Sequence, residues 1–310
     1  MELQPEEFEV IRRWMYRNSR PLDLARWRFH FEKGQIQPVL EALSVYQNAD
    51  GGFGHALEAD AWNPNSTPVM TNTAVERLLE LDFADAGHPL VQGILKYLDS
   101  GADQNGHTWS FNVASNNEYP HAPWWHTSSE STASSPYNPT AILAGFILKF
   151  AARDSALFER GSGIVQKLAE SFLQNPGLEM HPLRCVGTLL ECIAEAELQE
   201  QFPYPALLEA FTARSVQLVK RDAGNWTSYS CRPSFFIRSP LSPGHEELAL
   251  LLQQELDYLL AARNSAGIWD LTWSWTDYVR EFAISENWWK AHIVIENLLL
   301  LREFGRITAE

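Results

Sequence analysis

Three side chains able to do acid–base or metal chemistry follow a glycine-rich turn in the stretch GGFGHALEAD. His55, Glu58 and Asp60 lie close together there. An imidazole beside carboxylates can exchange protons with a substrate or bind a metal ion. The alternative interpretation is that they cap helices and bond the amides of a long loop. Because long loops usually have a functional reason, we predict these three as catalytic residues and Trp62 as a substrate-binding one.

The longest irregular segment, NNEYPHAPWWHTSSESTASSPYNPT at 116–140, supplies a second set of candidates. It contains His121, Trp125 and Tyr137, which we predict to bind substrate. The spacing of His121 and His126 is a weak metal motif. A surface insertion and a lid over a cavity are both compatible with this composition. Adjacent tryptophans are unusual in an exposed insertion, which favours the lid.

The aromatic maximum of the chain lies at 264–292, where acidic residues alternate with tryptophans. We predict Trp273, Trp275 and Trp288 as substrate-binding residues, because aromatic faces can stack on sugars or stabilise cations. The alternative is that these tryptophans pack between helices. Asp277 is a catalytic candidate, since glycoside hydrolysis needs a second carboxylate opposite Glu58 or Asp60.

Two arginines and one further tryptophan complete the candidates. Arg184 begins an apolar helical pattern and Arg232 follows a Gly-Asn-Trp turn. Guanidinium groups at a cavity mouth would suit a phosphate or a carboxylate, although each arginine could instead pair with a neighbouring acid. Trp109 follows another polar turn and is a candidate binding residue. The residue types identify neither a metal nor a cofactor.

The elements that would position these residues are helices. Apolar residues recur at three- and four-residue spacing, which predicts helices, and residues 1–17 form an amphipathic N-terminal segment. We find no alternating strand pattern. The helical patterns lie at 39–46, 73–81, 91–98, 141–150, 164–173, 184–198, 207–219, 248–262 and 291–304.

A polar Asn/Asp-Gly turn followed by an aromatic residue recurs after several of these helices, at 47–54, 99–111, 220–230 and 262–275. The glycines suit left-handed helix ends, and the aromatics would pack back on the helices. The repeating unit is a helix, a Gly-aromatic turn and a return helix, in about five imperfect copies. The copy containing residues 222–244 has no clear inner helix.

Gln47–Gly54, QNADGGFG, between two apolar helices resembles the repeat of the terpenoid cyclase and protein prenyltransferase α/α toroids, and especially small bacterial members of that superfamily. The resemblance implies an all-α fold in which inner helices form a barrel, outer helices surround it, and loops at one end enclose a cavity. It implies one domain over 1–310. Residues 35–304 would form the hairpin repeats, and helices within 1–34 would pack on them.

The chemical motifs of that superfamily are missing. The sequence contains no DxDD, no DDxxD and no Asp-x-Cys zinc motif. The resemblance therefore implies a fold and leaves the reaction open. We expect a protein that binds or acts on a small organic molecule, either an isoprenoid or a carbohydrate. For a carbohydrate, the chemistry would be that of a lyase, an epimerase or a hydrolase. The alternative is a non-catalytic binding or scaffold protein.

Composition and charge limit the classes of partner and the cellular location that we expect. A formal net charge of −15 without a basic cluster argues against nucleic acid as a partner. No apolar run reaches the roughly 18 residues of a transmembrane helix, and the N-terminus lacks a signal-peptide core. The three cysteines form no CxxC pair, so we expect a cytoplasmic protein without a disulfide framework.

Overall fold

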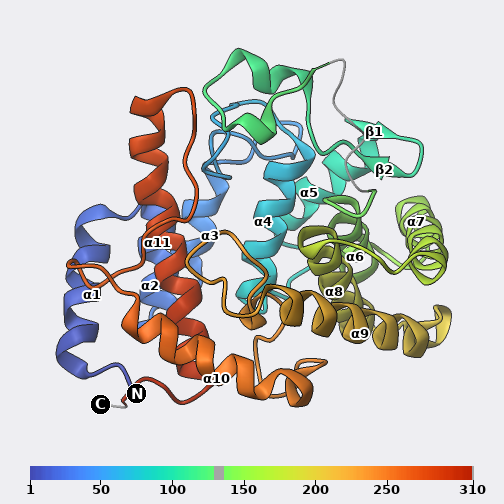
Figure 1. Cartoon of the computed structure of the whole chain (residues 1–310). Helices are drawn as coiled ribbons and strands as arrows, with labels where there is room; N and C mark the ends of the chain where they lie inside the picture. Colours follow the sequence, from blue (N-terminus) through green and yellow to red (C-terminus); the bar gives the residue numbers. More distant parts are fainter. Residues whose placement is uncertain (129–135, 309–310) are drawn as a thin grey trace. The chain divides into compact units, whose positions relative to one another are not determined.

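The computed structural model describes residues 1–128 and 136–308, and Figure 1 shows that these residues are mostly helical. The predicted all-α class is confirmed. Residues 129–135, which belong to the predicted lid, lie outside the described part. The described chain contains eleven α-helices: α1 (Pro5–Asn18), α2 (Pro21–Phe31), α3 (Gln37–Ser44), α4 (Pro68–Glu80), α5 (Pro89–Ser100), α6 (Thr140–Phe150), α7 (Ala156–Gln174), α8 (Met180–Glu195), α9 (Tyr204–Asp222), α10 (His245–Ala261) and α11 (Val279–Glu303).

Short elements interrupt the connections between these helices. A hairpin pairs two-residue strands, an arrangement that the sequence patterns did not predict. The strands are β1 (Gln104–Asn105) and β2 (Thr108–Trp109), and the 3-10 helices are η1 (Ala114–Glu118), η2 (Pro123–Trp125), η3 (Gln199–Gln201) and η4 (Pro233–Phe235). Between α9 and α10 the chain forms η4 and no α-helix.

The chain separates into two compact units. Unit 1 comprises Met1–Leu43 and Val216–Glu310, and unit 2 comprises Ser44–Ser215. The boundary falls within α9, whose two ends therefore belong to different units.

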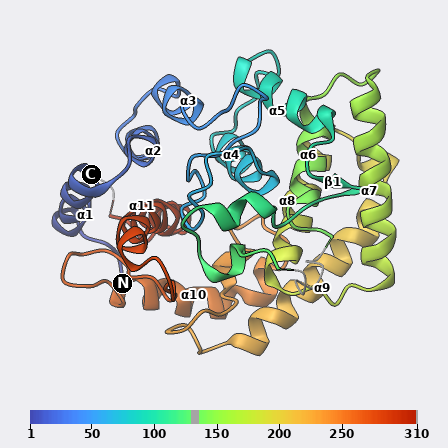
Figure 2. The same cartoon turned by 90° about the horizontal axis from the view of Figure 1, so that it is seen from above.

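The core of unit 2 is built around α6. All residues of this helix are buried except Lys149, as expected for a helix that is apolar on every side. Helix α6 packs against both α7 and α8, as Figure 2 shows. Close approach is possible because small residues face large ones, with Gly145 next to Cys192 and Gly161 next to Ile147.

In unit 1, helix α11 packs against α1 and α2. Helix α1 starts with a capping box between Gln4 and Glu7. Trp27 of α2 is fully buried, and its ring centroid lies 5.3 Å from that of Phe8. Backbone hydrogen bonds connect the two terminal segments, and in one of them the Leu3 amide donates to the Arg306 carbonyl at 2.8 Å.

Several helices begin earlier than their apolar patterns indicate. Helix α4 begins at Pro68, and the Thr67 hydroxyl accepts a hydrogen bond from the Met70 amide. Helix α7 begins at Ala156, before the pattern at 164–173, and α11 begins at Val279, so Trp288 lies inside the helix rather than at its start. No apolar pattern marked α2, although the resemblance implied helices within 1–34.

The first Gly-aromatic turn is held by its own backbone and by Gln47. The Asn48 amide donates to the Gly52 carbonyl at 2.8 Å, and the Gly51 amide donates to the Asn48 carbonyl at 2.9 Å. The Gln47 amide group donates to the carbonyls of Gly51 and Leu90 at 3.0 and 3.1 Å, which ties the turn to α5.

The turn at 264–268 in unit 1 repeats this pattern. Asn264 donates from its amide to the Ile268 carbonyl at 2.8 Å and accepts at its own carbonyl from the Gly267 amide at 2.9 Å. The residue spacing of both bonds matches the turn at 48–52. Two of the four predicted turns therefore share backbone hydrogen bonds as well as residue types.

We expect Gly51→Ala to destabilise the protein more than Gly106→Ala. Both glycines have positive φ (96° and 63°), which costs a non-glycine residue about 1–2 kcal/mol. At Gly51 a Cβ would also collide with the Gly93 backbone, whereas at Gly106 nothing lies within 4 Å. Overpacking should add about 1–3 kcal/mol, measured as the difference in unfolding free energy in urea. Equal losses in the two variants would contradict the close contact.

Candidate functional site

Two irregular segments that are far apart in the sequence pair with each other in unit 2. Ala61 and His121 form an antiparallel bridge. The Trp62 amide donates to the Pro120 carbonyl, and the Ala122 amide donates to the Asp60 carbonyl, both at 2.8 Å. We call residues 55–63 and 119–126 the paired loops. These backbone hydrogen bonds bring Asp60 and Trp62 of the first set beside His121 of the second.

Asn63 at the end of the first loop bonds to residues 115 and 116, which precede the second loop. Its side chain is fully buried and donates to Ser115 Oγ at 2.8 Å and to Asn116 Oδ1 at 2.9 Å. Its own Oδ1 accepts from the backbone and side-chain amides of Asn65, both at 3.0 Å. A buried amide bonded through both of its ends holds three segments in one arrangement.

The predicted catalytic residues of the first loop bond to their neighbours. His55 has φ 57°, and its Nε2 lies 2.9 Å from Asn48 Oδ1, so the ring is linked to the Gly-aromatic turn. Glu58 Oε2 accepts from the Asp60 amide at 3.0 Å. Asp60 is 3% exposed, and its carbonyl accepts the hydrogen bond from the Ala122 amide. These bonds hold residues 55–60 in position.

Ala61 and His121 are directly opposed in the antiparallel bridge, so their side chains lie on the same face. His121 forms a hydrogen bond with His126 of its own loop. His121 Nδ1 lies 2.6 Å from the Tyr119 carbonyl oxygen, and its Nε2 lies 3.2 Å from His126 Nδ1. A carbonyl only accepts, so His121 Nδ1 carries a proton. In the neutral pair, His121 Nε2 accepts from His126 Nδ1–H, which leaves the lone pair on His126 Nε2. His126 is exposed, so this nitrogen can meet a solute.

Aromatic candidates of unit 2 are buried. Trp125 is 6% exposed, its ring centroid lies 4.7 Å from that of Phe111, and Trp109 is 2% exposed. The indole N–H of each is buried without an acceptor in the described part of the chain. Tyr137 donates to the Leu168 carbonyl at 3.3 Å, and burial raises the pKa of its hydroxyl.

Arg184 and His181 lie together on the first turns of α8. His181 as a whole residue is exposed. The protein around the imidazole nevertheless disfavours its charge, and Arg184 adds repulsion, so the pKa of His181 falls from 6.5 to about 4. His181 is consequently neutral near pH 7.

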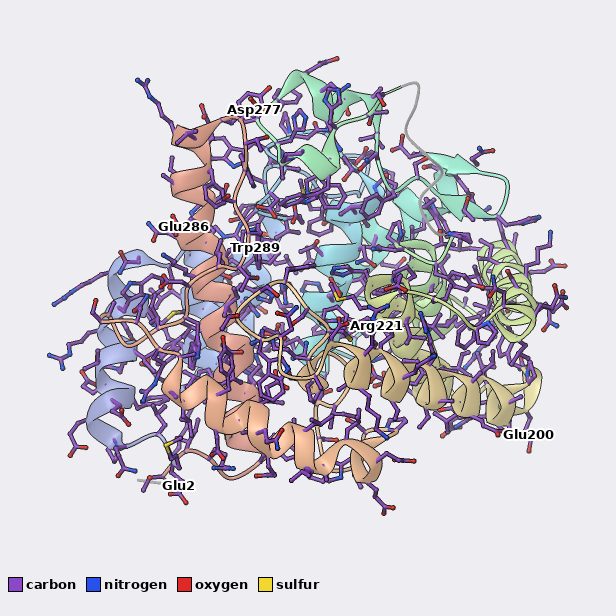
Figure 3. All side chains as sticks on the ribbon, in the orientation of Figure 1. Glu2, Glu200, Arg221, Asp277, Glu286 and Trp289 are labelled. Atoms are coloured by element: carbon purple, nitrogen blue, oxygen red, sulfur yellow. The ribbon has the colours of Figure 1, made fainter. Side chains whose placement is uncertain are left out.

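In unit 1, Arg232 has an acidic partner. Its Nε lies 3.5 Å from Oε1 of the fully buried Glu255. Burial raises the pKa of Glu255, although Arg232 and the Ser234 amide and hydroxyl act in the opposite direction. Asp277 is exposed on the loop before α11 (Figure 3) and accepts from Thr276 at 3.3 Å. Asp277 and Glu58 belong to different units, so their pairing stays a prediction.

The predicted tryptophans of unit 1 occupy different surroundings. Trp275 is 5% exposed and packs on Phe282, with ring centroids 5.6 Å apart. Trp273 contacts Trp289 edge-to-face at 5.4 Å. The guanidinium of Arg20 lies over the Trp288 ring at 5.1 Å.

Sequence reasoning missed the ionic residues of α2. Asp23 and Arg26 are each 1% exposed and lie on the core side of the helix. Oppositely charged residues three positions apart within an apolar pattern, as in DLARWRF, were the available signal. His126 was recognised only as part of a weak metal motif, and its role as a partner of His121 depends on the folded loop.

Comparison of the chain with protein-family models, curated proteins and solved structures gave no significant match. Within residues 1–128 and 136–308, no group of three or more His, Cys, Asp and Glu side chains is arranged to hold a metal ion. None of the helices in these ranges combines the length and the apolar character needed to cross a membrane.

Asn63→Ala should loosen the paired loops, because it leaves buried partners of Asn63 without hydrogen bonds. We expect a loss of about 1–3 kcal/mol and faster hydrogen exchange of the Trp62 and Ala122 amides. Asn65→Ala is the matched control, since it removes a bond to the same carbonyl at an exposed residue. Its effect should stay within about 0.5 kcal/mol. Unchanged exchange in Asn63→Ala would show that the backbone ladder alone holds the loops.

The His181 imidazole should titrate near pH 4, followed by its Cε1 proton in NMR spectra. Arg184→Gln removes a positive charge and should raise this midpoint, while burial keeps it below 6.5. Arg160→Gln, which alters a guanidinium bonded to Asp99, should leave the midpoint in place. A wild-type midpoint close to 6.5 would contradict this account of the α8 N-terminus.

Proposed function

We propose that this chain is an α/α toroid that binds a small organic molecule at the paired loops and acts on it by acid–base catalysis. The observation that carries the proposal is the His121–His126 pair, whose hydrogen bonds set both tautomers and leave a basic nitrogen on an exposed ring. Support for the toroid comes from the helical repeat and from the matching turns at 48–52 and 264–268.

The pair can take up a proton and distribute the charge. When His126 Nε2 accepts a proton from a substrate, its Nδ1 proton can move to His121 Nε2 across the 3.2 Å hydrogen bond. His121 Nδ1–H keeps its bond to the Tyr119 carbonyl throughout. The positive charge is then shared by two nearly parallel rings, 13° apart in tilt, which stabilises the protonated base.

The substrate classes in this proposal are an isoprenoid and a carbohydrate. Both present apolar faces that fit beside Trp62 and the aromatic residues of the 119–126 loop. In the same proposal the protein is cytoplasmic. Cys185, Cys192 and Cys231 are buried free thiols, the form that a reducing compartment maintains.

The tautomers provide a test that requires no substrate. Nitrogen-15 NMR of the histidine rings near neutral pH should show His126 protonated at Nδ1 and bare at Nε2. His121 should be protonated at Nδ1. A His126 ring carrying its proton on Nε2 would remove the basis of the proposal.

Turnover provides the second test, using isoprenoid diphosphates and oligosaccharides as substrates and mass spectrometry as the readout. General-base catalysis is worth about 100–10,000-fold, so His126→Gln should lower kcat by at least about 100-fold. The matched control is His107→Gln, which changes another exposed histidine of unit 2. Equal kcat in the wild type and His126→Gln would reject the catalytic role, and binding without turnover would favour the scaffold alternative.

A further inference from the structure

Unit 1 contains a buried ionic cluster at the contact of α2 with α11. Arg26 is 1% exposed and donates to Asp23 Oδ1 at 3.0 Å. Arg20 donates to the other Asp23 oxygen at 2.9 Å. Burial would raise the pKa of Asp23, but Arg20 and Arg26 together hold it below its ordinary value. The carboxylate is therefore ionised and fixes two guanidiniums in place.

The same cluster extends along one face of α11. Trp289, His292 and Glu296 follow one another at three- and four-residue spacing, which puts them on one side of the helix. Figure 3 shows Trp289 midway along α11. Arg26 lies 3.9 Å from Glu296 Oε1, and Arg238 lies 2.7 Å from Glu296 Oε2.

Arg26 determines which nitrogen of His292 carries the proton. Its Nη2 lies 3.3 Å from His292 Nδ1. A guanidinium only donates, so His292 Nδ1 accepts and the neutral ring carries its proton on Nε2.

Two hydrogen-bond donors adjoin His292. The Trp289 ring lies 5.6 Å from the His292 ring, and Trp273 lies 5.4 Å from Trp289. The indole N–H groups of Trp273 and Trp289 are both buried without an acceptor in the described chain. Buried indole N–H groups usually have a partner, and two adjacent ones without acceptors need a common explanation.

We infer that the Trp273–Trp289–His292–Arg26 cluster is a binding site for the anionic oxygen group, phosphate or carboxylate, of a small organic molecule. The two indole N–H groups are donors without acceptors in the described chain, and an anionic group beside the Arg26 guanidinium supplies acceptors for both at once. The tryptophan faces provide an apolar surface for the rest of the molecule. The residues of this site all belong to unit 1.

The indole protons report directly on such binding. The chain has twelve tryptophans, and nitrogen-15 labelling of their indoles allows Trp273→Phe and Trp289→Phe to identify two of the signals. Inorganic phosphate and benzoate are the probes, each compared with chloride at equal ionic strength. We expect saturable downfield shifts of the Trp273 and Trp289 protons. The Trp269 signal should not move, because its N–H donates to the Leu259 carbonyl at 2.8 Å.

Affinity in the variants separates binding from a change in folding. Trp289→Phe keeps an aromatic ring and removes the N–H, so it should weaken binding of the active probe roughly tenfold. Trp226→Phe removes another buried indole N–H that lacks an acceptor, next to Tyr258, and should leave affinity unchanged. His126→Gln in unit 2 should also leave it unchanged, so failure of the catalytic proposal would not be mistaken for failure of this one.

Each outcome decides the inference. A shift with phosphate identifies a phosphorylated ligand, and a shift with benzoate alone identifies a carboxylated one. Shifts no larger than those with chloride, or equal affinity in the wild type and Trp289→Phe, would overturn the site. In that case the two indoles bond only to water.

Discussion

The need to satisfy the backbone of one buried irregular segment, residues 47–67, determines the arrangement of unit 2. Most residues between Gly51 and Asn63 are buried without forming a helix, so each amide and carbonyl needs a partner from elsewhere. The Gln47 side chain bonds to the carbonyls of Gly51 and of Leu90 in α5. Residues 120–122 supply partners for the Asp60 carbonyl and the Trp62 amide. Asn63 then joins this segment to η1. The pairing that satisfies the backbone also brings His121 beside Ala61, so the candidate site is a consequence of hydrogen-bond satisfaction.

The two units use polar groups differently. In unit 2 the imidazoles of His121 and His126 bond directly to each other, and the Tyr119 carbonyl accepts from His121, which fixes tautomers and suits proton transfer. In unit 1 ionised Asp23 holds guanidiniums beside indole donors, which suits binding of an anion. Buried charges are costly unless they are paired, and Asp23 pairs with the buried guanidinium of Arg26. The adjacent indoles of Trp273 and Trp289 have no acceptor in the described chain, so an oxygen-rich ligand would suit them.

Local features of the chain were predictable because they depend on near neighbours. Apolar spacing predicted the all-α class and the central parts of most helices, but it placed the starts of α4, α7 and α11 too late and did not mark α2. The Asn-Gly turns were also predictable, since a positive φ such as that of Gly51 favours glycine. The turns at Asn48 and Asn264 form the same backbone hydrogen bonds.

The sequence by itself indicated most of the helical segments and the glycine-containing turns. Periodicity, turn chemistry and side-chain type are local properties, so they can be recognised without a fold. Only the tertiary structure decided that His121 bonds to His126, because the 119–126 loop has to fold before the two rings can meet. Only the packing of α2 on α11 could show that Arg26 and His292 meet. Contacts between distant segments depend on register and burial, which one-dimensional spacing does not contain.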